Sequence, residues 1–257
     1  MIRDATPDDL PLIRDIFARG NDVPYDLARV AEEKCFGAGF AGAPRVRIAD
    51  EHGVAVTCGD VLRILCVDRE HRGRGIGSAL LADSNAQTIG AEPGNYFVAG
   101  VPDGPMVNWL TKRGYAEKSR THDVWARHSC LADANEGQTR MSGPPVLAFI
   151  EHHFGPIWRF EASRALGIFV IEADNDIAGF AAYEANNRGL GTFGPTGVAP
   201  QYRNRGYGRA LLHACLAELK RLGYERVIIP WTNAIDFYRK SCNAEVALEL
   251  VTMIRKP

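Results

Sequence analysis

The chain has 257 residues, a hydrophobic fraction of 46% and a formal net charge of −1 at pH 7. This length accommodates one large domain or two of ordinary size, each with its own buried core. A nearly neutral chain lacks the excess of Lys and Arg that binding to nucleic acid or an anionic membrane requires, so we expect neither partner.

The N-terminus and the cysteines predict where the protein works. No apolar run approaches the length of about 18 residues that a membrane span needs, and the first residues, MIRDATPDDL, carry acids where a signal peptide has an apolar segment. The six cysteines are scattered without a C-x-x-C pair, which is typical of buried thiols and offers no ligand set for zinc. We therefore expect a cytoplasmic protein without a metal ion.

The first half of the chain alternates short strands and helices. Thr6 and Pro7 indicate a helix start, because Thr caps the helix and Pro fits its first turn. Glu51-His52-Gly53 predicts a hairpin turn. The elements expected here are a strand at 1–5, helices at 6–17 and 25–35, strands at 45–49, 54–58 and 61–67, a helix to about 89, a strand at 96–101, a helix at 107–113 and one strand or a strand pair at 115–126.

A similar order follows after residue 143. Residues 128–143 are polar and aperiodic, so we interpret them as a linker between domains at 1–127 and 144–257; the alternative is a long loop within one domain. The second half shows no clear first strand. The elements expected in it are helices at 146–154 and 158–166, strands at 168–172, 177–184 and 190–198, a helix at 207–222, a strand at 226–229, a helix at 234–241 and a strand at 244–254.

One glycine- and arginine-rich pattern occurs twice at the start of a predicted helix. HRGRGIGSALL begins at His71, and QYRNRGYGRALL begins at Gln201; their common part, Arg-x-x-Gly-x-Gly, starts at Arg72 and again at Arg203. A helix start exposes N–H groups without partners and carries partial positive charge. Glycine lets a ligand approach these groups, and arginine adds charge, so each copy predicts an anion site suited to a pyrophosphate.

Two other glycine-rich phosphate loops do not fit. A P-loop requires Gly-Lys-Ser/Thr after its spacer, and this triplet is missing from the sequence. The dinucleotide fingerprint requires a third glycine, where the two copies have Ser78-Ala79 and Ala210-Leu211. The remaining alternative is a solvated turn before a helix, which the repetition of the pattern in strand–turn–helix context makes less attractive.

The repeated Arg-x-x-Gly-x-Gly pattern resembles the coenzyme A signature of the GCN5-related N-acetyltransferases (GNAT). The resemblance implies an α/β fold of two GNAT domains in tandem, each a twisted mixed sheet flanked by helices, with acetyl-CoA as co-substrate and no metal. In the second copy it assigns the coenzyme to Val198, Ala199, Arg203, Asn204, Arg205, Gly206, Tyr207, Gly208 and Arg209. In the first copy it assigns the coenzyme to Cys66, Val67, Arg72, Gly73, Arg74, Gly75, Ile76, Gly77 and Ser78.

A late helix in the second half resembles the family's Asn…Phe-Tyr-x-Lys motif. By this resemblance Asn233, Phe237 and Lys240 contact coenzyme A, and Tyr238 faces the departing sulfur. A phenol titrates near ~10 and a thiol near ~8.5, so full proton transfer is uphill and a hydrogen bond to the developing thiolate is the more economical role. The alternative for Tyr238 is a packing residue on an amphipathic helix.

The amine acceptor has to lose a proton, and four residues are candidates for the base. Glu184 lies near the end of a predicted strand, and the others, Glu151, His152 and His153, lie on the first helix of the second domain. Each of them also has an ordinary structural interpretation, a turn residue for Glu184 and a solvated helix face for the rest. His71, beside the first copy, is interpreted as an anion-binding residue.

The first domain departs from the family at the catalytic position. Aligning Gly114-Tyr115 with the family's Gly-Phe places Trp109-Leu110 where Phe-Tyr stands, and Leu110 cannot donate a proton. We therefore expect one catalytic centre, in the second domain. The function expected is acetyl transfer from acetyl-CoA to a primary amine of a small molecule or peptide, by direct attack and by a monomer or homodimer. The alternative is a non-catalytic acyl-CoA-binding or scaffold protein.

Overall fold

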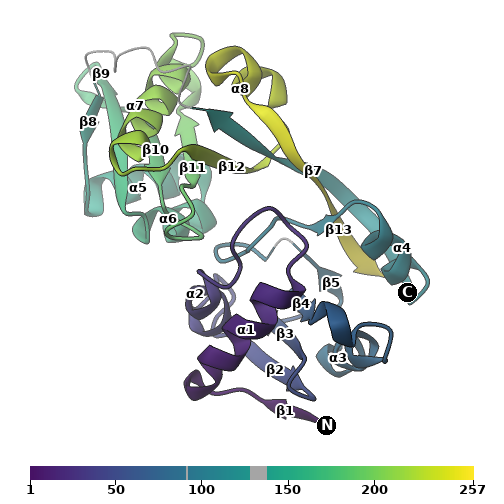
Figure 1. Cartoon of the computed structure of the whole chain (residues 1–257). Coiled ribbons are helices and arrows are strands. Elements are labelled where there is room, and N and C mark those ends of the chain that lie inside the picture. Colours follow the sequence, from purple (N-terminus) through teal and green to yellow (C-terminus); the bar gives the residue numbers. More distant parts are fainter. Residues whose placement is uncertain (91, 128–137) are drawn as a thin grey trace. The chain divides into compact units, whose positions relative to one another are not determined.

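The computed structural model describes residues 1–90, 92–127 and 138–257 as two compact units of helices and mixed sheet (Figure 1). Unit 1 consists of Met1–His122 and Leu248–Pro257, and unit 2 of Asp123–Ala247. None of the helices in the described part of the chain is both long and apolar enough to span a membrane.

Unit 1 is built on a mixed sheet with the strand order β1-β2-β3-β4-β5-β13-β7, in which β6 also pairs with β13. The β4–β5 pair is parallel, whereas β1–β2, β2–β3, β3–β4 and β5–β13 are antiparallel. The elements are β1 (Ile2–Asp4), α1 (Leu10–Gly20), α2 (Ala31–Phe36), β2 (Arg45–Ala49), β3 (Gly53–Cys58), β4 (Val61–Val67), α3 (Ile76–Ser84), β5 (Thr88–Ile89), β6 (Val101–Pro102), α4 (Pro105–Thr111), β7 (Tyr115–Arg127) and β13 (Glu245–Arg255).

Unit 2 contains an antiparallel sheet with the order β11-β10-β9-β8 and a further strand, β12, that pairs with β7. Side chains alternate across β10: Ala181 and Tyr183 pack with α7, whereas Phe180 and Ala182 pack with α5 and α6. Helices therefore cover both faces of this sheet. The elements are β8 (Gln138–Arg140), α5 (Pro144–Phe154), α6 (Pro156–Ser163), β9 (Gly167–Ala173), β10 (Asp176–Tyr183), β11 (Phe193–Val198), α7 (Tyr207–Arg221), β12 (Arg226–Thr232) and α8 (Ile235–Cys242).

The structure confirms the predicted fold class and the strand–turn–helix context of both glycine-rich segments, because β4 precedes α3 and β11 precedes α7. Several predicted elements are shorter: the helix expected to reach 89 ends at Ser84, and the strand expected at 96–101 is reduced to Val101–Pro102. Asn85, at φ 49°, caps α3 in the left-handed region and ends it early.

The division of the chain differs from the predicted boundaries of 1–127, 128–143 and 144–257. Both β7 and β13 continue from one unit into the other, so the last residues, Leu248–Pro257, belong to unit 1. Gln138–Arg140, inside the predicted linker, form β8 and supply the first strand that the sequence did not reveal. Residues 128–137 of the predicted linker lie outside the described residues. Buried β13 side chains, among them Val251 and Met253, complete the core of unit 1.

A carboxylate on α7 attaches the short strand β8 to unit 2. Glu218 forms ion pairs with Arg140 of β8 and with Arg221, the latter at 2.7 Å. The hydrogen bond from Arg221 is the largest of the effects that hold the pKa of Glu218 at about 2, below its ordinary value of 4.5. Because the folded protein holds this proton less tightly than the unfolded chain, the stabilisation is present above pH 4.5 and is lost as pH falls toward about 2.

We expect Glu218→Gln to remove the part of the pH dependence of the free energy of unfolding that comes from this ion pair. The variant should be less stable than the wild type at neutral pH, and the difference should shrink as pH falls through the window from 4.5 to about 2. Urea unfolding at several pH values across the window measures it, with Glu225→Gln, a change at an exposed glutamate of unit 2, as the control. A difference that stays constant with pH would contradict the ion-pair explanation.

Candidate functional site

The first part of the candidate site is the place where β11 and β12 separate. The two strands run parallel and share a single bridge, between Thr192 and Ile228, within the described chain. Ala199 N–H donates to Ala178 O at 2.9 Å, so Ala199 is a hydrogen-bonded position of the antiparallel pair β10–β11. Hydrogen-bonded and non-bonded residues alternate along such a pair. The backbone groups of Thr196 and Val198 therefore point away from β10. An extended ligand could therefore pair with β11 through these two residues, whereas the N–H of Ala199, a predicted contact, is engaged within the sheet.

The second part is the start of α7, which follows β11 after one 3-10 turn. Gly206 is the N-cap and has φ 81°, a conformation that glycine adopts without strain. The first hydrogen bonds of the helix are donated by Arg209 and Ala210 to Gly206 O. In the described part of the chain no acceptor is recorded for the N–H groups of residues 204–208, so a row of donors faces outward.

Both glycines of this turn keep space open beside the donors. A Cβ on Gly206 would meet nothing within 4 Å, and one on Gly208 would lie 3.8 Å from Phe237 Cζ and 3.9 Å from Val198 Cγ2. Arg203 Nε donates to Val198 O at 3.2 Å, and the guanidinium of Arg205 lies 5.4 Å from the ring centre of Tyr202. These arginines and Arg209 form no ion pair with an acid among the residues described, so their charge is available to an anion.

The third part is α8, which carries the predicted late motif. Tyr238 is 7% exposed and packs edge-on against Phe193, the first residue of β11, with ring centroids 6.2 Å apart. Burial raises the pKa of Tyr238 well above its ordinary value, so the phenol stays protonated at neutral pH. Phe237 is 39% exposed, and Asn233 and Lys240 are exposed. His213 Nε2 lies 2.8 Å from Ser241 O and attaches α8 to α7.

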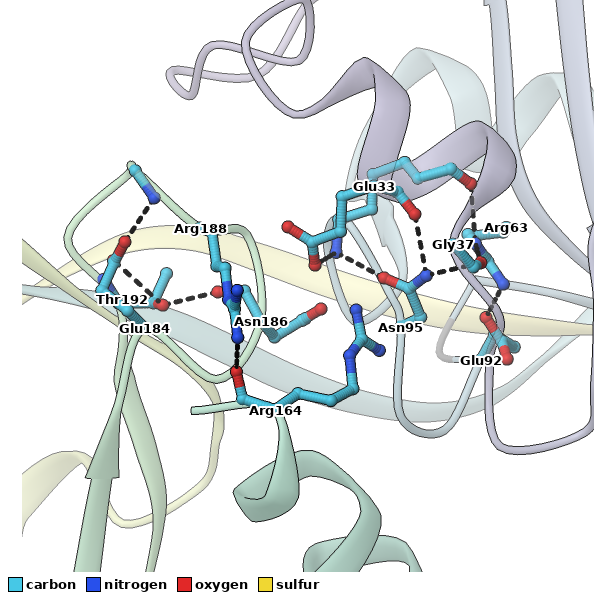
Figure 2. Close-up of polar contacts among 12 residues, drawn as sticks. Glu33, Gly37, Arg63, Glu92, Asn95, Arg164, Glu184, Asn186, Arg188 and Thr192 are labelled. Atoms are coloured by element: carbon cyan, nitrogen blue, oxygen red, sulfur yellow. Dashed lines mark hydrogen bonds and ion pairs between the residues drawn. The ribbon is translucent and has the colours of Figure 1, made fainter. Parts of the chain in front are cut away.

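The carboxylate of Glu184, one of the predicted bases, accepts hydrogen bonds from the loop between β10 and β11 (Figure 2). It is 2% exposed; Oε1 accepts from Thr192 N–H at 2.7 Å, and Oε2 accepts from Gly189 N–H and from the Tyr224 hydroxyl at 3.1 Å. Its own N–H donates to Thr192 O at 2.8 Å. Both carboxylate oxygens thus hold the loop between β10 and β11, which fits an anchoring role better than proton abstraction.

A substitution separates these two roles. Glu184→Gln places an amide N–H₂ where a carboxylate oxygen faces donors, so we expect a loss of about 1–3 kcal/mol in the free energy of unfolding and no change in the shape of the pH–rate profile. Urea unfolding and the pH dependence of kcat measure both. The control is Glu225→Gln, because Glu225 is an exposed glutamate of unit 2 that is not a candidate for the base. A stable Glu184→Gln protein with little turnover would instead support the base.

The other predicted bases lie at a different place in unit 2. His152 and His153 line a surface groove of about 450 Å³ between α5 and the β9–β10 hairpin, together with Glu172 and Asp176. Burial, with a smaller effect of His152, lowers the pKa of His153. The residues lining this groove include none from the start of α7 or from α8. The structure therefore does not bring the histidines together with Tyr238.

Unit 1 contains a similar arrangement of strands and helix start, formed by residues whose numbers are 131 lower than those of unit 2. β4 and β5 pair in parallel at Val61, as β11 and β12 do at Thr192. Gly75 caps α3 at φ 87°, and Arg72 Nε donates to Val67 O at 3.1 Å, matching Gly206 and Arg203. A Cβ on Gly77 would lie 3.9 Å from Trp109, as one on Gly208 would lie near Phe237. The predicted correspondence of Trp109 and Phe237 is thereby reproduced in space.

Three differences distinguish the copy in unit 1. Arg72 forms an ion pair with Asp22 at 2.9 Å, so an anion would compete with a carboxylate. Leu110 is 1% exposed in the core, at the place that corresponds to Tyr238. Cys66, a predicted coenzyme contact, is buried, and its burial raises the pKa of its thiol to about 12.

A further difference is an arginine in the gap between β4 and β5, which the sequence did not single out. Arg63 directly follows the point where β4 and β5 separate, donates to Lys34 O at 2.7 Å and pairs with Glu92 at 2.6 Å (Figure 2). Asn95 receives a hydrogen bond from Lys34 Nζ at 2.9 Å in the same cluster. The residue 131 positions later is Gly194, where a Cβ would meet nothing within 4 Å. Arg63 thus fills a position that is open in unit 2.

Comparison with known proteins gives one family and a set of similar folds. Residues 138–244 match the model of the "Acetyltransferase (GNAT) family", and no curated protein matches. A fungal GCN5-related glucosamine N-acetyltransferase region, part of a multi-domain GH3 beta-N-acetylglucosaminidase, is similar at TM-score 0.76 and 16% identity, over 98% of this chain and 38% of that chain.

Two further solved structures are similar over nearly their whole length. A GCN5-related N-acetyltransferase from Sphaerobacter thermophilus matches at TM-score 0.69 and 17% identity, over 100% of this chain and 96% of that chain. A tandem GNAT protein from the clavulanic acid biosynthesis pathway matches at TM-score 0.70 and 14% identity, over 98% of this chain and 97% of that chain. At such identities these likenesses establish the fold.

Proposed function

We propose that unit 2 is the catalytic domain of an N-acetyltransferase that uses acetyl-CoA, because residues 138–244 match the model of the acetyltransferase (GNAT) family. The observation that carries the proposal is the combination, in one unit, of separated strands β11 and β12, outward N–H groups at the start of α7, and a buried tyrosine packed against Phe193. The acceptor proposed is a primary amine of a small molecule or peptide.

The residues at the start of α7 fit a coenzyme pyrophosphate. The N–H groups of residues 204–208 supply hydrogen-bond donors, and Arg203, Arg205 and Arg209 supply positive charge without a competing acid among the described side chains. The open space at Gly206 leaves room for the phosphate oxygens. We assign the pantetheine arm to the β11 backbone at Thr196 and Val198, and coenzyme contacts to Asn233, Phe237 and Lys240.

The proposed reaction is direct transfer. The neutral amine nitrogen attacks the acetyl carbon, the carbon–sulfur bond breaks with its electron pair left on sulfur, and the attacking nitrogen releases one proton to water. Tyr238 donates a hydrogen bond to the developing thiolate, and its raised pKa keeps the proton on the phenol until charge accumulates. A donor aimed at charge that develops only in the transition state accelerates turnover without tightening substrate binding.

Unit 1 is proposed to be a second GNAT-fold domain that does not catalyse the reaction. Leu110 replaces the tyrosine, and Arg63 occupies the gap between β4 and β5 that would receive the acyl arm. The N–H groups of residues 73–77, before and at the start of α3, have no acceptor within the described residues, so an anion can still bind there.

The test is release of free coenzyme A thiol from acetyl-CoA in the presence of an amine panel of polyamines, amino acids, aminoglycosides and a peptide with a free N-terminus. Thiol release should depend on one class of amine. The five described cysteines are buried, which limits their own contribution to the background of a thiol reagent. Calorimetric binding of acetyl-CoA without release in any amine would favour the non-catalytic binding protein instead.

A further inference from the structure

Three side chains of metal-binding type meet in unit 1, at the beginning of the segment that leads into α3. His52 lies in the turn between β2 and β3, Asp68 directly follows β4, and His71 ends the next 3-10 turn. One ligand atom from each lies within 4.8 Å of the others. The three residues come from separate positions in the chain, which is why the sequence predicted no metal site.

Two ring nitrogens in this cluster have no hydrogen-bond partner among the described residues. Nδ1 of His52 and Nδ1 of His71 are both inaccessible to solvent and make no hydrogen bond within the described residues. The two rings stack with centroids 3.4 Å apart and planes inclined by 10°. Buried nitrogens without partners are destabilising in themselves, and a cation that accepts their lone pairs satisfies both.

The distances suit a small tetrahedral ion. His71 Nδ1 lies 3.4 Å from Asp68 Oδ2. Ligands about 2.0–2.1 Å from zinc in a tetrahedron are separated by roughly 3.3 Å, so these two atoms already have the spacing of neighbouring ligands. His52 follows Asp50 and Glu51, which have φ 48° and 58° in a surface turn, and its ring has to rotate out of the stack with His71 for its Nδ1 lone pair to meet the same ion.

Other groups orient the carboxylate. Asp68 Oδ1 accepts from Glu70 N–H at 3.2 Å, and Oδ2 accepts from Arg19 Nε at 2.9 Å. The N–H of Asp68 donates to His52 O at 2.8 Å, which joins the hairpin turn to the end of β4. Such outer contacts are typical of metal sites, because they hold the ligands in one orientation.

We propose that His52, Asp68 and His71 bind one divalent transition-metal ion, with zinc the best match to two imidazole nitrogens and one carboxylate oxygen. A set of three protein ligands leaves a fourth position for water. The ion ties the β2–β3 turn to the residues that precede Arg72, and so stabilises the segment that forms the first anion site.

The experiment is isothermal titration calorimetry of ZnCl₂ into the metal-stripped full-length chain in a buffer that does not bind metals. One equivalent should bind to the wild type with a dissociation constant in the micromolar range or below. His52→Gln, His71→Gln and Asp68→Asn should each weaken binding by about 100-fold or more, since loss of an outer partner alone costs about 10–100-fold. Circular dichroism before titration shows that each variant is folded.

The matched control is His152→Gln combined with His153→Gln, which removes the histidine pair of unit 2 and should leave zinc binding unchanged. Cobalt supplies a second readout, because a tetrahedral site produces visible absorption that His71→Gln should abolish. Absence of saturable zinc binding to the wild type, or zinc binding that disappears in the control rather than in His71→Gln, would overturn the proposal.

Discussion

Gly206→Glu is expected to abolish acetyl transfer, whereas Gly75→Glu leaves turnover largely intact. A glutamate at Gly206 projects into space that is otherwise open, beside the N–H groups proposed to hold the pyrophosphate. Two like charges about 4 Å apart near a protein surface repel by about 4 kcal/mol, which corresponds to roughly 1,000-fold in kcat/KM.

The two glycines form a matched pair. Gly206 and Gly75 are both helix N-caps, at φ 81° and 87°, and a Cβ on either would meet no atom within 4 Å. The conformational strain of the substitution, about 1–2 kcal/mol, is therefore shared, and the difference between the variants reports on ligand binding. Steady-state kinetics and calorimetry with acetyl-CoA measure it. Activity that is lost with Gly75→Glu and kept with Gly206→Glu would move the catalytic centre to unit 1.

Tyr238→Phe is expected to lower kcat by about 100- to 1,000-fold, the loss typical of removing one donor from a developing negative charge. The affinity for acetyl-CoA should stay nearly unchanged, because the hydroxyl acts on the sulfur only as the bond breaks. The phenyl ring retains the packing of Tyr238 against Phe193 and within the core of unit 2, so the variant should fold.

The control is Tyr183→Phe, which removes the hydroxyl of another buried tyrosine in the same unit. Its kcat should remain close to that of the wild type. Kinetics with the amine identified by thiol release, together with calorimetry, separate kcat from binding. Unchanged kcat in Tyr238→Phe would make Tyr238 a packing residue and would remove the proposed donor.

Local sequence was sufficient for the parts of the site that depend on neighbouring residues. The Arg-x-x-Gly-x-Gly pattern predicted two helix starts, and both glycines at the N-cap adopt the left-handed conformation that the pattern requires. Trp109 and Phe237, which the alignment pairs, each lie on a short helix beside the second glycine of their copy. Helical spacing and turn chemistry act over a few residues, so they can be read from the chain.

Contacts between distant residues needed the tertiary structure. The ion pair of Arg63 with Glu92, the role of Glu184 in its loop and the meeting of His52 with His71 all depend on side chains that the sheets bring together. The same applies to β13, whose last residues belong to unit 1 although they follow unit 2 in the chain. The sequence by itself determined the two helix starts, the fold class and the late tyrosine. Only the tertiary structure decided strand partners and polar contacts, because pairing energies depend on proximity in space that local pattern does not encode.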